Sequence, residues 1–239
     1  MQISHASKVV LVTGGTGGLG RSVVLAFAAE NAKVTTTYRN AAELTALKQA
    51  AGEKAGFIEG VQADATDESA ISALVSSILS KHGRLDVVVN TVGGYAGGIK
   101  LWELEPKVFE RMLDLNLRVG FVLGRTTIPA LVQQGRGVLI NVAAKAAFDH
   151  AAGASAYAAS KAAAVALMDC LAADVKGTGV RVNSILPSII DTEANRKGMP
   201  DADFDRWPKP EEIARVILFL ASDEARVVHG ASVPVYGES

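Results

Sequence analysis

Short runs of apolar, mostly β-branched residues alternate along the chain with stretches of helical periodicity. The runs Val9-Val10-Leu11-Val12 and Val87-Val88-Val89 are apolar at every position instead of at every second one. A strand has this pattern when both of its faces are buried, as they are in a parallel sheet that is covered by helices. The alternation therefore predicts a three-layer α/β fold, in which a doubly wound parallel sheet of about seven strands carries helices on both faces.

The elements can be placed from the same pattern. The expected strands are Lys8–Thr13, Lys33–Tyr38, Gly56–Gln62, Leu85–Asn90, Gly137–Val142, Val180–Leu186 and Ser232–Val235. The expected helices span residues 19–31, 41–52, 67–82, 106–134, 153–176 and 210–221. No linker, repeat or low-complexity run divides the 239 residues, so we expect one domain over residues 1–239.

The composition argues against several classes of partner. The chain has 24 Lys and Arg residues against 25 Asp and Glu residues, with no basic run, so we expect no nucleic-acid partner. The four histidines, at positions 5, 82, 150 and 229, lack the spacing of a metal site, and we expect no metal. With no signal peptide and no apolar run of transmembrane length, we expect a cytoplasmic protein without a membrane partner. We expect the single cysteine, Cys170, to be buried in a helix.

A glycine-rich segment follows the first expected strand and leads into the first expected helix. It reads Thr13-Gly14-Gly15-Thr16-Gly17-Gly18-Leu19-Gly20. Glycine lets the backbone turn tightly and approach a pyrophosphate group, and the free N–H groups of the helix then bind that group. The strand–glycine–helix order favours a nucleotide site over an ordinary turn, and it makes the expected sheet Rossmann-type.

A second candidate site lies on the expected helix over residues 153–176. Tyr157 and Lys161 are four residues apart, so their side chains lie on one face of this helix. An ammonium group beside a phenol favours the phenolate. We therefore expect Lys161 to lower the pKa of Tyr157, which suits the phenol to proton transfer near neutral pH.

Together these motifs resemble the short-chain dehydrogenase/reductase family, over essentially the whole chain. The glycine segment matches the family's T-G-x-x-x-G-x-G spacing, and Tyr157 with Lys161 matches its catalytic pair. The resemblance implies an oxidoreductase that acts on a small-molecule substrate with a nicotinamide cofactor. Tyr157 would be the general acid, Lys161 would lower its pKa and bind the nicotinamide ribose, and Asn116 would support a proton relay. The cofactor half would be about 1–142, and the substrate and catalytic part about 143–239.

Further positions match the cofactor contacts of the family. Asn90 and Gly93 resemble its N-N-A-G segment, although Thr91 and Val92 depart from it, and Asp64 matches the residue that contacts adenine. Pro187 and Thr192 match its P-G-x-x-x-T stretch, with Ser188 in place of the glycine. The resemblance thus assigns cofactor binding to Gly14, Thr16, Gly18, Leu19, Gly20, Asp64, Asn90, Gly93, Tyr157, Lys161, Pro187 and Thr192.

The end of the second expected strand bears on the choice between NAD and NADP. A carboxylate there would accept hydrogen bonds from the ribose 2′-hydroxyl of NAD, but this chain has Tyr38, followed by Arg39. A guanidinium group suits a 2′-phosphate by its charge and its fork geometry. We therefore favour NADP over NAD; the alternative is that Arg39 is an ordinary surface charge.

The catalytic serine of the family is missing. Family members usually place it thirteen residues before the tyrosine, where its hydroxyl bonds the substrate oxygen, and this chain has Ala144 there. Loss of one such donor from a site built around it costs roughly 10²–10³-fold in rate. One branch of the superfamily, the quinonoid dihydropteridine reductases, keeps the tyrosine and lysine without the serine. The segments that resemble this branch are 144–149, 93–98 and 191–207.

The second resemblance implies a quinonoid dihydropterin or similar conjugated ring as substrate, which needs less polarisation than a ketone. Ala144, Tyr95 and Trp207 would then face the substrate. The two aromatic side chains would stack on a flat ring, or else they are packing residues. One alternative is a carbonyl or 3-oxoacyl reductase in which Ser155, Thr91 or a water replaces the serine. The other is a non-catalytic NADP-binding protein.

The expected helix over residues 153–176 has no polar face. Its alanines lie on every side, at positions 154, 156, 158, 159, 162, 163, 164, 166, 172 and 173. A helix that is apolar all round is usually buried all round, and the sheet can cover only one side. We therefore expect a homodimer or homotetramer through this helix and its neighbour at 106–134, with exposed alanines as the alternative.

Overall fold

The computed structural model describes residues 4–239 and confirms the expected Rossmann-type sheet. Seven parallel strands lie in the order β3-β2-β1-β4-β5-β6-β7. The chain starts in the middle of the sheet, builds outward to β3, and returns to place β4 on the other side of β1. In doubly wound sheets this reversal of direction marks the ligand site, at the carboxyl ends of the strands.

The elements follow the expected alternation closely. The strands are β1 (Val9–Thr13), β2 (Lys33–Tyr38), β3 (Ile58–Gln62), β4 (Val87–Asn90), β5 (Gly137–Val142), β6 (Val180–Pro187) and β7 (Ser232–Val235). The helices are α1 (Gly18–Ala29), α2 (Ala41–Ala51), α3 (Glu68–His82), α4 (Pro106–Leu113), α5 (Val119–Gln134), α6 (Ser155–Asp174), α7 (Glu193–Gly198) and α8 (Pro210–Ala221).

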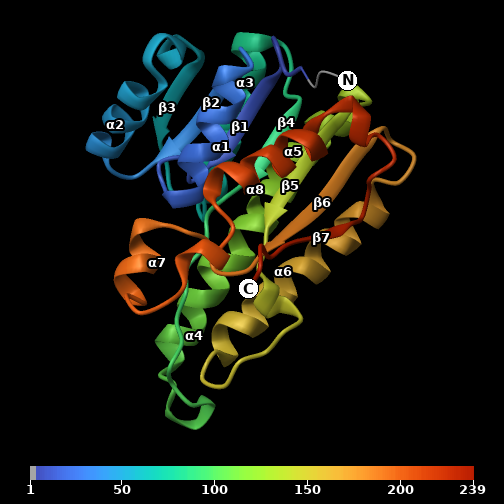
Figure 1. Cartoon of the computed structure of the whole chain (residues 1–239). Coiled ribbons are helices and arrows are strands. Elements are labelled where there is room, and N and C mark those ends of the chain that lie inside the picture. Colours follow the sequence, from blue (N-terminus) through green and yellow to red (C-terminus); the bar gives the residue numbers. More distant parts are fainter. Residues whose placement is uncertain (1–3) are drawn as a thin grey trace.

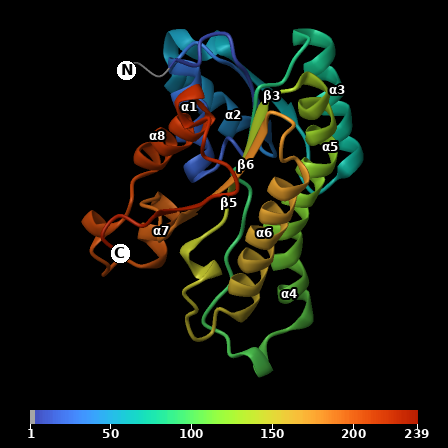
Figure 2. The ribbon, with the colours of Figure 1, turned by 90° about the vertical axis from the view of Figure 1, so that its right-hand side faces the viewer.

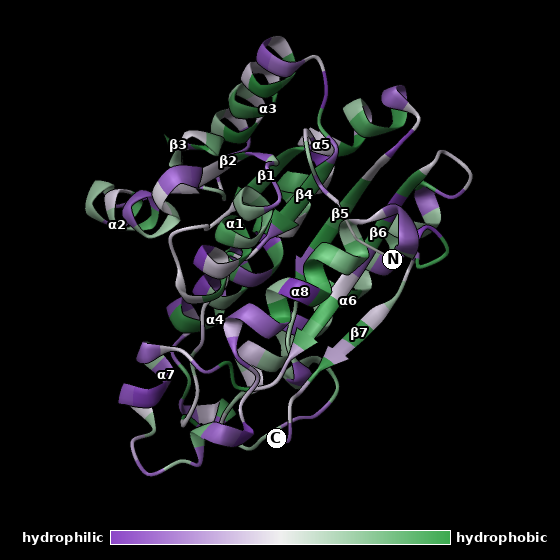
Figure 3. Ribbon diagram, turned by 45° about the horizontal axis from the view of Figure 1, so that its top comes forward, coloured by the Kyte–Doolittle hydropathy of each residue, from purple (hydrophilic) through white to green (hydrophobic). Residues whose placement is uncertain are grey.

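Helices cover both faces of the sheet. One core joins the strands to α1 and α8, with Phe27 and Ile217 fully buried, and α2 contributes Leu47 to it. The opposite core joins the strands to α3, α5 and α6. Figure 1 and Figure 2 show the two helix layers on either side of the sheet, and α4 and α7 extending past the carboxyl ends of the strands. In Figure 3 the central strands are largely green, whereas α7 is mostly purple, as expected of a segment outside the core.

The structure departs from the sequence-based prediction around residue 116. The expected single helix over 106–134 is interrupted by a π-helical turn at Asp114–Arg118, which separates α4 from α5. Such turns occur frequently at functional sites, because the extra residue redirects one side chain. Here the redirected segment contains Asn116, which is buried. Helix α7 was not predicted at all, because six residues carry too little periodicity to show.

The expectation that Cys170 is buried was wrong. Helix α6 packs one face on the sheet, and Cys170 lies on the opposite, exposed face. Helix α6 is also long and apolar enough to cross a membrane by length and composition. In the fold, however, it packs against β6 and α5 and buries Lys161, as a core helix does.

Candidate active site

The glycine segment forms the turn between β1 and α1. Gly14 has a φ of 74°, in the left-handed region that favours glycine, and its N–H donates to Thr37 Oγ1 at 3.0 Å. A side chain on Gly20 would bring its Cβ within 2.1 Å of the Gly14 carbonyl oxygen, so glycine is required there for the helix to pack against the turn. No side chain caps the start of α1 at Gly17. The first N–H groups of the helix are therefore left for a ligand, and this fits the pyrophosphate of a dinucleotide.

The end of β2 faces this turn from the neighbouring strand. Tyr38 ends β2, and Arg39 is exposed immediately after it. Hydrogen bonds from Thr66, first from its N–H and then from its hydroxyl, and the nearby charge of Arg39 hold the pKa of Asp64 below its ordinary value. The charge of Arg39 thus reaches Asp64 across the ends of β2 and β3.

One carboxylate at this end of the site, that of Glu43, was not predicted from the sequence. Thr16, in the glycine turn, donates from Oγ1 to Oε2 of Glu43 at 2.9 Å. Glu43 lies in the first turn of α2, four residues after Arg39. The chain thus has no carboxylate at the end of β2, but it has one, that of Glu43, in the first turn of the next helix. An acidic residue in the first turn of the helix after β2 is the signal that would have found it.

Three buried polar residues connect the central strands below the site. Asn90, at the end of β4, accepts from Thr13 Oγ1 at 3.0 Å and donates to Asn141 Oδ1 at 2.8 Å. It also accepts from the N–H of Val92 at 3.1 Å, which fixes the start of the loop after β4. Asn90 therefore fixes the backbone at the start of the loop after β4. Its own side-chain amide is hydrogen-bonded to other protein groups.

Asn116 holds the same loop from the other side. Its Oδ1 accepts from the N–H of Gly94 at 2.9 Å, and its Nδ2 donates to the carbonyl of Gly94 at 3.0 Å. The same Nδ2 group lies 3.0 Å from Ser160 Oγ, which donates to the carbonyl of Tyr157 at 2.8 Å. The π-helical turn thus ties the loop after β4 to the helix that carries Tyr157.

Tyr157 and Lys161 meet on one face of α6, as the spacing predicts. The Nζ atom of Lys161 lies 6.0 Å from the ring centroid of Tyr157 and donates to the carbonyl of Val142 at 3.1 Å. A Cβ on Gly93 would lie 3.1 Å from both Lys161 Nζ and Asn116 Oδ1, so the glycine keeps the loop close to these groups. Lys161 is only 4% exposed.

The expected lowering of the Tyr157 pKa is not found in the protein alone. Burial, and secondarily the neighbouring Tyr95, raise the pKa of Tyr157 to about 12. Burial also lowers the pKa of Lys161 to about 8. The loss of hydration outweighs the attraction between ammonium and phenolate, because the two groups lie at a distance and not in contact. Near neutral pH the pair is therefore a protonated phenol beside a mostly protonated amine.

Thr91 and Ser155, two of the three groups that could replace the serine, do not lie on the helix face of Tyr157. Thr91 donates from Oγ1 to the carbonyl of Thr13 at 2.7 Å, beneath the glycine turn. Ser155 starts α6 two positions before Tyr157, and residues two apart do not share a helix face. Its Oγ is buried without a hydrogen-bond partner. Ala144 itself is buried just after β5, and it has a methyl group where the family's serine would have a hydroxyl group.

The two aromatic candidates differ. The ring of Tyr95 lies edge-to-face against Tyr157, with centroids 5.0 Å apart, and its side chain is exposed. Trp207 is 5% exposed and packs against Phe204, which favours the packing alternative. Pro187 ends β6, and Thr192 caps α7 by accepting from the N–H of Asn195. A Cβ on Gly18 would lie 2.8 Å from Thr192 Cγ2, so the segment after β6 closes over the glycine turn.

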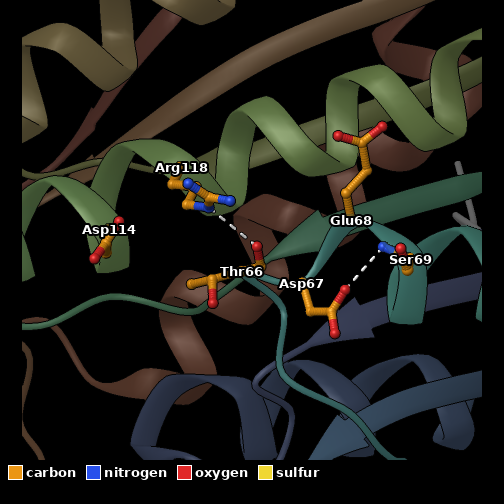
Figure 4. Close-up of a pocket in the computed structure, with 6 residues that line it drawn as sticks. All are labelled: Thr66, Asp67, Glu68, Ser69, Asp114 and Arg118. Carbon is orange, nitrogen blue, oxygen red and sulfur yellow. Dashed lines mark hydrogen bonds between the residues drawn. The ribbon is translucent and has the colours of Figure 1, made fainter.

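A separate surface pocket of about 510 Å³ lies between the loop after β3 and the π-helical turn (Figure 4). It is lined by Thr66, Asp67, Glu68, Ser69, Asp114 and Arg118. Several of these groups are already committed, since Arg118 donates to the carbonyl of Thr66 and Asp67 caps α3. Three carboxylates make the pocket unsuitable for phosphate groups, and none of the motif residues lines it. We therefore do not place the cofactor there.

Comparison with known proteins decides the family. Residues 8–203 match the family described as short chain dehydrogenase. The chain belongs to this family. Among its relatives, the 3-oxoacyl-[acyl-carrier-protein] reductase FabG of Thermotoga maritima is 30% identical over 238 residues, which are 96% of each chain. The D-threitol dehydrogenase of Mycolicibacterium smegmatis is 31% identical over 239 residues, covering 96% of this chain and 92% of the relative.

The solved structures agree. A short-chain type dehydrogenase/reductase from Mycobacterium ulcerans superposes with a TM-score of 0.92 at 28% identity, covering 98% of this chain and 90% of the other. The short-chain dehydrogenase resemblance is thus confirmed, and with it an oxidoreductase that uses a nicotinamide cofactor on a small-molecule substrate.

The buried lysine of this short-chain dehydrogenase predicts a measurable effect on stability. Its pKa is about 8 in the folded protein against 10.5 when exposed, so the protonated lysine favours unfolding at neutral pH. Lys161→Met should therefore raise the free energy of unfolding at pH 7. The gain should shrink as the pH rises from about 8 toward 10.5, where the native lysine loses its proton in both states.

Urea unfolding of both proteins at several pH values would measure this. Lys145→Met, which changes a lysine that is not fully buried, is the control and should show no such pH-dependent gain. A Lys161→Met protein that is less stable than the native one at every pH would contradict the prediction.

Proposed function

We propose that this protein is an NAD(P)H-dependent reductase whose substrate is a quinonoid dihydropterin or a similar conjugated ring. The observation that carries the proposal is that Tyr157, Lys161 and Asn116 are retained, whereas position 144 has only the methyl group of an alanine. A quinonoid ring regains conjugation when it is reduced, so it depends less than a ketone on a hydroxyl that polarises the accepting atom. Binding a cofactor without turnover would not require all three retained groups.

In this proposal Tyr157 donates the proton. Its raised pKa keeps the phenol protonated at neutral pH, which is the form that a reduction consumes. The ammonium group of Lys161 stabilises the phenolate that remains after the donation. Asn116 positions the loop at Gly94 and, through Ser160, the backbone of Tyr157. A bound nicotinamide cofactor supplies the hydride.

The residues around the glycine turn fit the cofactor. The uncapped start of α1 would hold the pyrophosphate, and Asp64 the adenine. Tyr38 and Arg39 would lie at the ribose, where Arg39 pairs with a 2′-phosphate. Pro187 and Thr192, on the segment that approaches Gly18, would lie near the nicotinamide.

A second candidate function is reduction of a carbonyl or a 3-oxoacyl group. The relative from Thermotoga maritima carries the name of a 3-oxoacyl reductase, and it matches nearly the whole chain. The position of Ala144 argues for the first candidate, because a ketone gains most from the missing donor. The two candidates predict different responses to restoring the serine.

The serine test separates these candidates. Tyr157→Phe should impair reduction of every substrate, because it removes the proton donor. Ala144→Ser should give little or no gain with a quinonoid dihydropterin, but it should raise activity on simple ketones, where a donor at the developing oxyanion helps. Steady-state rates with both substrate types would measure this. An increase of orders of magnitude on the quinonoid ring would contradict the proposed adaptation.

The cofactor preference provides another prediction. We expect NADPH to bind more tightly than NADH, and Arg39→Ala to weaken NADPH by about tenfold or more, the effect of one charge-assisted hydrogen bond, while leaving NADH unchanged. Glu43→Gln, which removes the carboxylate beside Thr16, should shift the preference further toward NADPH. Fluorescence titration of each protein with both cofactors would measure the affinities. Equal affinities in the native protein would contradict the preference.

We also propose that the protein is a homodimer or homotetramer in the cytoplasm. The outer face of α6 exposes Ala159, Ala166 and Ala173, and the neighbouring helix α5 exposes Phe121. The face is interrupted only by Asp169 and Asp174, so it suits contact with a second copy better than contact with water.

Sedimentation at micromolar concentration should show no stable monomer. Ala166→Arg should dissociate the assembly, because a charged side chain on a close-packed helix face prevents contact. Ala50→Arg, on the exposed side of α2, is the matched control and should leave the assembly intact. A monodisperse native monomer would mean that the alanines are simply exposed.

A further inference from the structure

The loop after β4 holds a second phenol beside Tyr157. The rings of Tyr95 and Tyr157 lie edge-to-face, with centroids 5.0 Å apart and planes at 75°. Within residues 4–239, neither phenol oxygen takes part in a hydrogen bond to another protein group. Two neighbouring phenol hydroxyl groups are therefore free to bind a ligand.

The loop is anchored on both sides of Tyr95. Before it, Gly94 makes two hydrogen bonds to the side chain of Asn116. After it, the N–H of Ile99 donates to the carbonyl of Gly153, in the loop that leads to α6. Tyr95 is thus an exposed side chain on a fixed backbone, tied to the segments that carry Asn116 and Tyr157.

The absence of a side chain at Gly97 leaves room for the Tyr95 hydroxyl group. A Cβ on Gly97 would lie 2.0 Å from the phenol oxygen of Tyr95 and 2.5 Å from its Cζ. Any other residue at 97 would therefore displace the ring from this orientation. Tyr95 also contributes to the raised pKa of Tyr157, after the larger effect of burial.

We propose that the Tyr95 hydroxyl takes the place of the missing serine, as the second hydrogen-bond donor to the substrate atom that Tyr157 protonates. The inference rests on the proposed reductase function and deepens it. A conjugated ring lying against the Tyr95 side would receive one hydrogen bond from each phenol. Its reacting atom would need no donor at position 144. The edge-to-face contact holds the two rings together and leaves Tyr95 accessible, with 70% of its surface exposed.

Kinetics of a matched set of variants tests the proposal. Tyr95→Phe keeps the ring and removes only the hydroxyl, so kcat/KM for a quinonoid dihydropterin with NADPH should fall by about tenfold, the value of one hydrogen bond. Ala144→Ser in the Tyr95→Phe background should restore most of this loss. Tyr236→Phe, which also removes one phenol hydroxyl, is the control and should stay within about twofold of the native protein.

Two kinetic outcomes would overturn the proposal. One is a Tyr95→Phe protein with native kinetics on the quinonoid dihydropterin, a quinone and a ketone. The other is a loss that Ala144→Ser does not restore, since the hydroxyl would then serve a different atom.

A measurement without substrate keeps the proposal distinct from the reductase function. NMR of protein carrying tyrosine labelled with ¹³C at Cζ would report the pKa of Tyr157, which faces Tyr95 on one side and Lys161 on the other. Tyr95→Phe should lower this pKa and Tyr236→Phe should not. An unchanged pKa would overturn the coupling of the two phenols. A native protein that turns over no substrate would instead contradict the reductase function, and the NMR result would still decide the coupling.

Discussion

Lys161 places an ammonium group inside the fold, 4% exposed, with the carbonyl of Val142 as its hydrogen-bond partner. Within the described residues no carboxylate pairs with it, and burial lowers its pKa to about 8. Such a group favours unfolding at neutral pH, so its position has to be supported by the surrounding packing. The support comes from α6, from the end of β5 and from the loop that Asn116 holds at Gly94. Burial also raises the pKa of Tyr157, so burial sets the protonation state of both side chains.

The π-helical turn at Asp114–Arg118 links the helix that carries Lys161 to the loop after β4. It brings the Asn116 side chain inward, where the amide bonds Gly94 on one side and Ser160 on the other. The loop after β4 is thereby fixed against α6, with Tyr95 next to Tyr157. An alanine instead of a serine at position 144 therefore changes which hydrogen bonds the site can offer a substrate. It leaves the bonds from Asn116 to Gly94 and Ser160 unchanged, because the side chain of residue 144 takes no part in them.

Much of the fold could be predicted from the sequence because β1 and β4 are buried on both faces and therefore contain continuous apolar runs. The glycine turn and the Tyr157–Lys161 pair were equally visible, since backbone conformation and helix spacing fix them locally. The π-helical turn was not visible, because one extra residue hardly changes an apolar period. The exposure of Cys170 was missed because α6 is apolar on all sides, and sequence does not say which side faces outward. The pKa of Tyr157 was misjudged because the proximity of a lysine can be read from sequence, but the loss of hydration on burial cannot.

The most direct test of the account follows the absorbance of the reduced nicotinamide as the native protein is mixed with NADPH or NADH. The panel of acceptors would contain a quinonoid dihydropterin, a simple quinone and a simple ketone. The account predicts that NADPH is oxidised fastest with the quinonoid ring and slowest with the ketone, because a ketone gains most from the donor that position 144 lacks. Faster oxidation with the ketone would contradict the proposed substrate class. Binding of NADPH without oxidation by any member of the panel would contradict the reductase function itself.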